Sequence, residues 1–250
     1  MKEVYKNVFQ RAGIGHLTYT TFASGGVFSK YSHEFQTLTS AGEDIIYLDE
    51  SSGVAVNKEV FNDEVLASLG LDKTKLVEHK AIEVGNIFEL KTRFSEPLDF
   101  SFVDEKGEKH KVLMGCYGIG LGRLMGTIVE ALSDDKGIVW PSSVAPFQIH
   151  LLSLGDDEEV LKQAEKVYES LNNSGIEVLF DDRVGLSPGE KFADADLLGI
   201  PMRAVVSKRS MKDLSVGAGG GIELKKRTEE KGQIVSLDEL LKICSKNSTN

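Results

Sequence analysis

A glycine-rich segment is the stretch of this sequence in which residue types and spacing most clearly predict chemistry. It runs Met114-Gly-Cys-Tyr-Gly-Ile-Gly-Leu-Gly-Arg123, between a strand-like run (110–114) and a helix-like run (124–132). Glycines at alternate positions let backbone N–H groups approach a ligand where any Cβ would collide. Arg123 stands where the helix begins, so a fixed positive charge and the positive end of the helix dipole point to one place. The segment therefore predicts a binding site for an anion.

Two common nucleotide-binding motifs do not fit this segment. A dinucleotide-binding fold needs G-x-G-x-x-G and an acidic residue about 20 positions later, at the end of a second strand. Here the order is G-x-G-x-G-R, and the next strand-like run, 137–140, ends at Pro141 without a carboxylate. A P-loop needs G-x-x-x-x-G-K and then Ser or Thr, and the sequence has no such string. The alternative without a ligand is a glycine-rich strand packed tightly against a neighbour.

Charged residues elsewhere are further candidates. Glu83 is a carboxylate within the apolar strand-like run 81–88, and such an acid is more often solvent-facing or paired than catalytic. His33 and Glu34 are neighbours on another predicted strand, so only one of them can face a pocket, and satisfied structural roles are the favoured interpretation. The run Asp181-Asp-Arg183 ends a predicted strand, where an ion-pair turn is the alternative to a ligand contact.

The periodicity of the chain predicts the elements that hold these residues. In the first half it predicts a helix over 1–12, short helical segments over 60–80, a hairpin over 98–103 and 111–114, and strands over 17–22, 33–38, 45–48, 54–56 and 81–88. After a Pro-bounded connector, 137–146, strands and helices alternate. The strands are predicted at 147–154, 176–180, 203–207 and 222–227, the helices at 156–175 (capped by Asp156 or Asp157), 189–198 and 237–245, and a glycine turn at 217–221. The fold class is α+β followed by α/β.

Several strings of the chain resemble one family. M-G-C-Y-G-I-G-L-G-R-L-M-G-T-I-V-E (114–130) is similar to motif 3 of class II aminoacyl-tRNA synthetases, and specifically to that of bacterial prolyl-tRNA synthetases. G-G-V-F-S-K-Y-S-H-E-F-Q and E-V-G-N-I-F-E-L-K-T-R-F-S resemble segments beside that family's aminoacyl site and before motif 3. A-P-F-Q, L-F-D-D-R and P-G-E-K-F-A-D-A-D-L-L-G-I-P resemble its anticodon-binding domain. The resemblance implies a partial class II catalytic core with an antiparallel sheet over 1–145 and an α/β anticodon-binding domain with a mixed sheet over 146–250.

The resemblance also implies a role for particular residues. Glu83 and Arg123 would be catalytic, Arg123 lying against bound ATP and Glu83 holding Mg²⁺ between the ATP phosphates, since that ion prefers oxygen ligands. The implied ATP site comprises Glu83, Asn86, Gly118, Gly120, Gly122 and Arg123. The implied proline pocket comprises His33, Phe88 and Cys116. The implied contacts with the anticodon of tRNA(Pro) come from Asp182, Arg183 and Lys191.

The implied reaction is proline–tRNA ligation: ATP and proline form prolyl-adenylate, and the prolyl group then passes to the tRNA. ATP and Mg²⁺ are the implied cofactors, and the full-length enzyme is expected to be a homodimer. The family's motifs 1 and 2 should precede residue 1, so we expect the chain to be inactive alone, as a truncated frame or half of a split enzyme. The family's editing domain has no room between 60 and 80. The alternatives are a non-catalytic tRNA-binding paralogue and, disfavoured by the intact motif 3, a synthetase-like polymerase subunit.

Composition bounds the remaining possibilities. The 250 residues suit one large or two medium domains, and 41% hydrophobic residues suffice for real cores. Lys and Arg number 29 against 39 Asp and Glu, a net charge of −10, which excludes a generally basic, nucleic-acid-coating surface. The two cysteines form no C-x-x-C pair, and no apolar signal core or long apolar run is present. We therefore expect a cytoplasmic protein with no disulfide framework, zinc site or membrane anchor.

Overall fold

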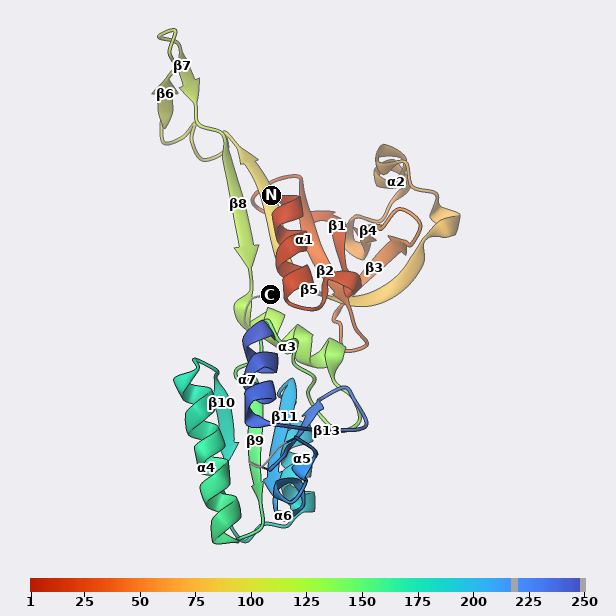
Figure 1. Cartoon of the computed structure of the whole chain (residues 1–250). Helices are drawn as coiled ribbons and strands as arrows, with labels where there is room; N and C mark the ends of the chain where they lie inside the picture. Colours follow the sequence, from red (N-terminus) through yellow and green to blue (C-terminus); the bar gives the residue numbers. More distant parts are fainter. Residues whose placement is uncertain (217–219, 248–250) are drawn as a thin grey trace. The chain divides into compact units, whose positions relative to one another are not determined.

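The computed structural model describes residues 1–216 and 220–247 and divides the chain into two compact units, Met1–Ala131 and Leu132–Asn250 (Figure 1). The domain boundary expected at 145/146 stays a prediction. Most of the predicted glycine turn, at 217–219, lies outside the described residues. Within the described part of the chain, no helix is long and apolar enough to cross a membrane.

The first unit is built on a six-stranded sheet in the order β2-β1-β4-β3-β5-β8, with an additional pairing of β2 with β5. All of its pairings are antiparallel except that of β1 with β4. Five predicted strands are confirmed, with these bounds: β1 Thr18–Ser24, β2 Tyr31–Leu38, β3 Asp44–Asp49, β4 Val54–Asn57 and β5 Val77–Lys91. The sixth strand of the sheet is β8, Met114–Ile119. The long β5 pairs with β3 through its first part and with β2 and β8 through its second, so it holds the unit together.

Helix α1 (Lys2–Arg11) covers one face of this sheet. Tyr5 and Phe9, four residues apart, share one side of the helix and are buried against Phe35 of β2, at ring-centroid distances of 4.9 and 5.4 Å. A Cβ on Gly85 of β5 would lie 3.0 Å from the Tyr5 ring and 3.3 Å from that of Phe9. The close contact between helix and sheet therefore favours glycine at this position.

The glycine-rich segment differs from its prediction. Its first part is itself a strand, β8, rather than a turn after one, and the helix α3 (Leu121–Leu132) begins earlier than expected and includes Arg123. The predicted hairpin exists as a separate ladder of β6 (Ser101–Val103) with β7 (Lys109–Lys111), beyond the ends of β5 and β8 (Figure 1). Its second strand ends before Met114, because Met114 pairs with β5 instead. The single α-helix described within 60–80 is α2 (Asp63–Leu69).

The second unit has a five-stranded mixed sheet in the order β10-β9-β11-β12-β13. Strand β9 pairs in parallel with both β10 and β11, whereas β12 pairs antiparallel with both β11 and β13. This mixed sheet confirms the predicted α/β class. Its strands are β9 Ile149–Leu154, β10 Val178–Asp181, β11 Met202–Ser207, β12 Ile222–Lys226 and β13 Gln233–Val235. Its helices are α4 Glu158–Asn173, α5 Pro188–Leu198, α6 Lys208–Met211 and α7 Leu237–Asn247.

Local sequence explains where the helices of this unit begin and end. Asp157 caps α4 by accepting a hydrogen bond from the Glu159 backbone N–H. Ser187 and Glu190 form a reciprocal capping box at the start of α5, which ends at Gly199 with φ of 70°. The side chains of α4 at positions 160, 164, 167 and 171 are buried against the sheet, as their helical spacing predicts.

Candidate functional site

A β-bulge in β5 brings the two polar residues of the expected ATP site to one face of the sheet. Along β2 and β5, Phe35 pairs with Gly85 but Gln36 pairs with Glu83, so Val84 is an extra, unpaired residue. In a regular strand, Glu83 and Asn86 would point to opposite faces. The extra residue reverses the alternation, and the Asn86 side-chain amide donates to Glu83 Oε1 at 3.0 Å. The bulge therefore assembles this pair.

Arg123 lies beside the same carboxylate. It is in the first turn of α3, and its Nη1 donates to Glu83 Oε2 and to the Glu83 backbone oxygen, both at 3.1 Å. The Arg123 side chain is half exposed and that of Glu83 is 28% exposed. A pair this accessible can still exchange partners with a ligand, because solvent and salt weaken its mutual attraction.

The glycines of the segment leave open space beside this pair. Gly118 of β8 pairs with Asn86 of β5, and a Cβ placed on Gly118 or Gly122 would meet no atom within 4 Å. At Gly120 an added Cβ would lie 3.5 Å from the Arg123 Cβ, an ordinary contact. Tight packing among the described residues therefore does not explain glycine at these positions, where the backbone stays accessible.

A buried carboxylate that the sequence analysis did not select lies next to the pair. Glu34, 8% exposed, accepts hydrogen bonds from Gln36 Nε2 at 2.9 Å and Asn57 Nδ2 at 3.1 Å, with Asn86 Nδ2 at 3.5 Å. Burial raises its pKa to about 7, although the bonds from Gln36 and Asn57 act in the opposite direction and the nearby charge of Glu83 adds to the rise. One pattern in the sequence could have identified this buried carboxylate. Glu34 and Gln36 are two residues apart on an apolar strand, which places both side chains on one face.

The expected proline pocket is only partly assembled. Phe88 and Cys116 are directly paired across β5 and β8, and the Phe88 ring packs against Phe28 with centroids 5.1 Å apart. His33 instead pairs with Ile87 and packs against Phe22. Neighbouring strand residues face opposite ways, so the structure places the His33 ring on the other face from Phe88 and Cys116.

His33 lies on the face of the sheet that α1 covers. Together with Lys2 and Glu89 it lines a cavity of about 380 Å³, which Phe88 also borders. Burial and the Lys2 charge lower the His33 pKa. The structure thus places His33 away from Cys116 although it borders one cavity with Phe88, and its contact with proline stays a prediction.

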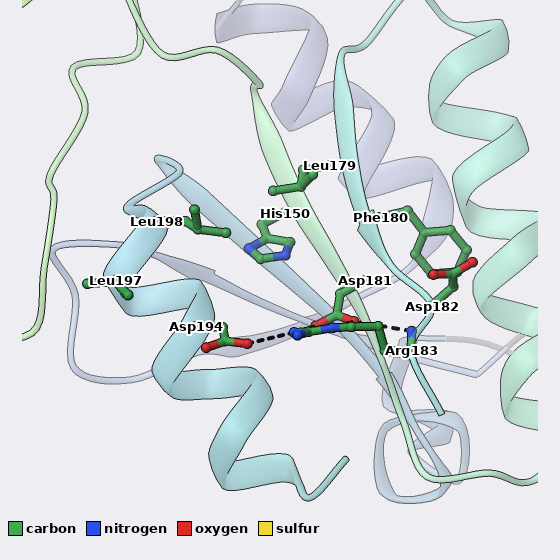
Figure 2. A pocket seen from close by; sticks show the side chains of 9 residues that line it. All are labelled: His150, Leu179, Phe180, Asp181, Asp182, Arg183, Asp194, Leu197 and Leu198. Atoms are coloured by element: carbon green, nitrogen blue, oxygen red, sulfur yellow. Dashed lines mark hydrogen bonds and ion pairs between the residues drawn. The ribbon is translucent and has the colours of Figure 1, made fainter. Parts of the chain in front are cut away.

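The residues of the second unit that were expected to contact the anticodon make other contacts in the structure. Arg183 is held by carboxylates: its Nε and Nη2 donate to Asp181 at 2.9 and 2.7 Å, and Nη2 donates to Asp194 at 2.7 Å (Figure 2). These bonds lower the pKa of Asp181 to about 2. Asp182 follows on the opposite side of β10, with Phe180 (Figure 2). The ion-pair alternative for this turn is therefore present in the structure.

Lys191 was expected to contact RNA phosphates, and the structure contradicts this. Its side chain is 2% exposed, and Nζ donates to the backbone oxygens of Ser153 at 2.8 Å and Asp181 at 3.2 Å. Lys191 lies on the sheet-facing side of α5, together with the buried Ala195 four residues later. It joins the ends of β9 and β10 and has no access to a ligand in solvent.

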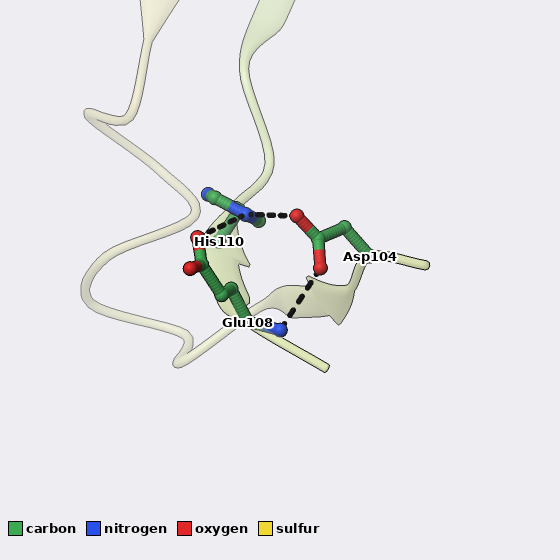
Figure 3. A group of neighbouring side chains, drawn as sticks. All are labelled: Asp104, Glu108 and His110. Atoms are coloured by element: carbon green, nitrogen blue, oxygen red, sulfur yellow. Dashed lines mark hydrogen bonds and ion pairs between the residues drawn. The ribbon is translucent and has the colours of Figure 1, made fainter. Parts of the chain in front are cut away.

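One further group in the described part of the chain has the composition of a metal site. Asp104, Glu108 and His110, on the hairpin of β6 and β7, place one ligand atom each within 4.8 Å of one another (Figure 3). His110 bonds Asp104 at 2.9 Å, and Asp104 Oδ1 accepts the backbone N–H groups of Lys106 and Glu108. These bonds form a polar turn at the exposed tip, which accounts for the cluster without an ion.

Comparison with known proteins identifies the family of each part of the chain. Residues 1–132 match the family described as "tRNA synthetase class II core domain (G, H, P, S and T)", and residues 143–247 match "Anticodon binding domain". The protein named "Proline--tRNA ligase" from Bacillus pumilus is 46% identical over 163 residues, which cover 65% of this chain and 27% of that protein. The protein of the same name from Persephonella marina is 44% identical over 169 residues, covering 67% of this chain and 29% of that protein.

A solved structure shows the same fold. The prolyl-tRNA synthetase from Cryptosporidium parvum complexed with halofuginone and AMPPNP has a TM-score of 0.67 at 19% identity, covering 99% of this chain and 44% of that chain. The chain thus spans less than a third of the curated relatives and less than half of this structure. With the class II core matched over more than half of its length, the chain belongs to the class II tRNA synthetases and carries an anticodon-binding domain after the core.

Proposed function

We propose that this chain is part of a proline–tRNA ligase, which joins proline to ATP as prolyl-adenylate, releases pyrophosphate, and passes the prolyl group to tRNA(Pro). The names of its curated relatives support proline and tRNA as the substrates. The observation that carries the proposal is the contact of Arg123 with Glu83 at 3.1 Å, beside glycines that no neighbouring atom restricts. A fixed cation next to accessible backbone suits the polyphosphate of ATP.

Each residue of this site has a separate task in the proposal. Arg123 neutralises charge on the ATP phosphates, which carry most of the negative charge in adenylate formation. Gly118 and Gly122 keep the approach to β8 and α3 open. Adenylate formation from two bound substrates is then mainly a matter of positioning and of charge neutralisation.

The donor chemistry of the site also suits Mg²⁺. The Glu83 carboxylate retains free lone pairs beyond its bonds to Asn86 and Arg123, and the Asn86 side-chain oxygen is buried with no hydrogen-bond partner among the described residues. Both are the hard oxygen ligands that this ion prefers, usually together with substrate phosphates. Glu83 and Asn86 would therefore hold the ion, which supplies further neutralisation of phosphate charge when bound.

The remaining parts of the proposal concern the other substrates. Phe88 and Cys116, on the same face as the Glu83 pair, would line the proline pocket together with Phe28, whose ring packs against Phe88. The expected anticodon-binding domain, from about residue 146 in the second unit, would bind the anticodon loop of tRNA(Pro). The complete ligase is proposed to work as a cytoplasmic homodimer.

The test is proline-dependent ATP–pyrophosphate exchange by an enzyme that carries this chain together with the amino-terminal motifs of the family. Arg123→Ala is expected to lower kcat/KM for ATP about 10- to 100-fold, because a charged hydrogen bond contributes about 1.5–3 kcal/mol. The KM for proline should stay unchanged. The matched control is Arg11→Ala, which removes the same charge from an exposed position on α1.

Two outcomes would contradict the proposal. Wild-type turnover and ATP dependence in the Arg123→Ala enzyme would remove Arg123 from the ATP site. An enzyme that binds tRNA(Pro) but catalyses no exchange, even with motifs 1 and 2 present, would identify the non-catalytic paralogue instead.

A further inference from the structure

A groove of about 580 Å³ lies in the first unit, between the end of β5 and the start of β2 with the turn before it. Its volume falls within the range of ligand sites in proteins. Its lining comprises Phe28, Ser29, Lys30, Tyr31, Glu89, Leu90, Lys91, Thr92 and Arg93. The side chains of Lys30, Lys91 and Arg93 make this groove cationic.

The three cations of the groove have no acidic partner. Within the described part of the chain, no ion pair includes Lys30, Lys91 or Arg93. Glu89 is the single acid of the lining, and the charge of Lys2 interacts with it from outside the groove. Four other arginines each contact a carboxylate: Arg123, Arg183, Arg203 and Arg227. In a chain with a net charge of −10, this groove is therefore a local positive surface.

Two of these cations are positioned by the groups beside them. Arg93 Nη1 donates to the backbone oxygen of Phe28 at 3.5 Å, which connects the end of β5 to the turn before β2. Lys30 Nζ lies over the Tyr31 ring, 5.0 Å from its centroid. Both groups keep further N–H donors for another acceptor. The groove therefore offers donors from each of its sides to an anionic oxygen.

Lys91 has a backbone conformation that favours glycine. Its φ is 48°, in the left-handed region where a Cβ comes too close to the following carbonyl oxygen. Glu89 pairs with Gly115 and Lys91 with Met114, so the buried Leu90 between them is an extra residue of β5. Glycine would relieve this strain but would remove the charge from the groove. Strain retained at a residue that lines a groove points to a function for its side chain.

The groove adjoins the proline pocket proposed above. Phe28 lines the groove, and its ring packs against Phe88 with centroids 5.1 Å apart. Phe88 pairs with Cys116 across β5 and β8. In prolyl transfer the last nucleotide of the tRNA has to reach this pocket, so the nucleotides before it have to cross the neighbouring surface. Their phosphates are anions, which lysine and arginine side chains neutralise.

We propose that this groove binds the phosphate backbone of the single-stranded 3′ end of tRNA through Lys30, Lys91 and Arg93. The proposal rests on the function proposed above, because that function requires an RNA end beside the proline pocket. Contacts with phosphates carry no sequence information. The groove therefore positions the end of the RNA and does not select tRNA(Pro).

The experiment measures binding of the 250-residue chain to two RNAs by fluorescence anisotropy over a series of salt concentrations. One RNA is a minihelix with the acceptor stem of tRNA(Pro) and its single-stranded 3′ end, and the other is a blunt copy without that end. The wild-type chain should bind the first RNA more tightly. Three phosphate contacts with a single strand should also steepen its plot of log K against log salt concentration by about 2.

The Lys91→Gly variant separates the strain at this position from the charge. Glycine relieves the left-handed backbone, so the melting temperature should rise. The lost charge should lower the salt slope for the minihelix with the 3′ end by about 0.7, and its affinity about fivefold at about 0.1 M salt. Binding of the blunt copy should not change. A triple variant that adds Lys30→Ala and Arg93→Ala should bind both RNAs alike.

The matched control is Lys106→Gly, which removes the same charge from an exposed turn outside the groove. This variant should keep the wild-type salt slope and the wild-type preference for the 3′ end. The melting temperature of every variant checks that it is folded.

The outcomes distinguish this proposal from the proposed function. Equal wild-type affinity for the two RNAs, or equal salt slopes of Lys91→Gly and Lys106→Gly, would overturn the RNA groove. Tight binding of inorganic triphosphate that Lys91→Gly abolishes, without a preference for the 3′ end, would assign the groove to a free polyphosphate instead. The proposed function is tested by ATP–pyrophosphate exchange, which needs no RNA, so exchange activity can persist when the groove proposal fails.

Discussion

The buried carboxylate of Glu34 should make the stability of the first unit depend on pH in an unusual direction. Its pKa is about 7 in the folded chain against 4.5 in an unfolded one, mainly because burial penalises the charged form. The folded state thus retains a proton that the unfolded state has already lost. The stabilisation is complete below about pH 4.5 and is lost as the pH rises through 7. At about 1.36 kcal/mol for each pH unit, the difference is about 3 kcal/mol.

Glu34→Gln removes this titration while keeping the shape of the side chain. The free energy of unfolding of the wild-type chain, relative to the Gln variant, should therefore fall by about 3 kcal/mol between pH 4.5 and 8. The measurement is urea unfolding of the 250-residue chain followed by far-ultraviolet circular dichroism. Trp140, the only tryptophan, is in the second unit, so its fluorescence transition should not respond to the substitution.

Glu64→Gln, at an exposed position of α2, is the matched control and should leave the pH dependence unchanged. A wild-type stability that rises relative to the Gln variant between pH 4.5 and 8, or that stays parallel to it, would refute the reasoning. Either result would mean that the amide groups around Glu34 compensate fully for its burial.

Two further predictions concern buried groups of the second unit. Lys191→Met should lower the free energy of unfolding by about 1–3 kcal/mol, because the backbone oxygens of Ser153 and Asp181 lose a buried donor. The salt dependence of RNA binding should not change in this variant. A reduced salt dependence would contradict this and would support a contact of Lys191 with RNA phosphate. Cys244 is fully buried with its pKa raised to about 11, whereas Cys116 is partly exposed, so a thiol reagent should modify Cys116 first and Cys244 only as the chain unfolds. Mass spectrometry of the modified protein checks this order, and equal rates at the two cysteines in the folded chain would contradict it.

The elements of this fold were predictable where one periodicity runs without interruption. The helix at 1–12 and the strands at 33–38 and 81–88 follow from spacing alone. The short β13 and α6 were missed because three or four residues carry too little pattern, and their positions depend on β12 and β11, against which they lie.

The site was less predictable than the elements, because it depends on which face each residue takes. The family resemblance selected Glu83 and Arg123, which the structure brings into contact, but Glu34 was set aside as structural, and nothing local marks Val84 as unpaired. Lys191 shows the same limit on a helix. Its four-residue spacing from Ala195 indicated a shared face, yet its charge suggested solvent, and only the oxygens at the ends of β9 and β10 make its burial acceptable.

The unpaired Val84 also sets what kinds of sequence change this site can survive. Substitutions in β5 alter one side chain at a time and leave the alternation of all the others unchanged. A deletion at position 84 would remove the extra residue and leave Glu83 two positions from Asn86, so a regular strand would still hold both side chains on one face. The same loss at a paired position of β5 would instead move the residues on one side of it to the opposite face. A scan by substitution would therefore classify position 84 as ordinary core, whereas a scan by single deletions would distinguish it from its paired neighbours as the position of β5 whose loss keeps Glu83 beside Asn86.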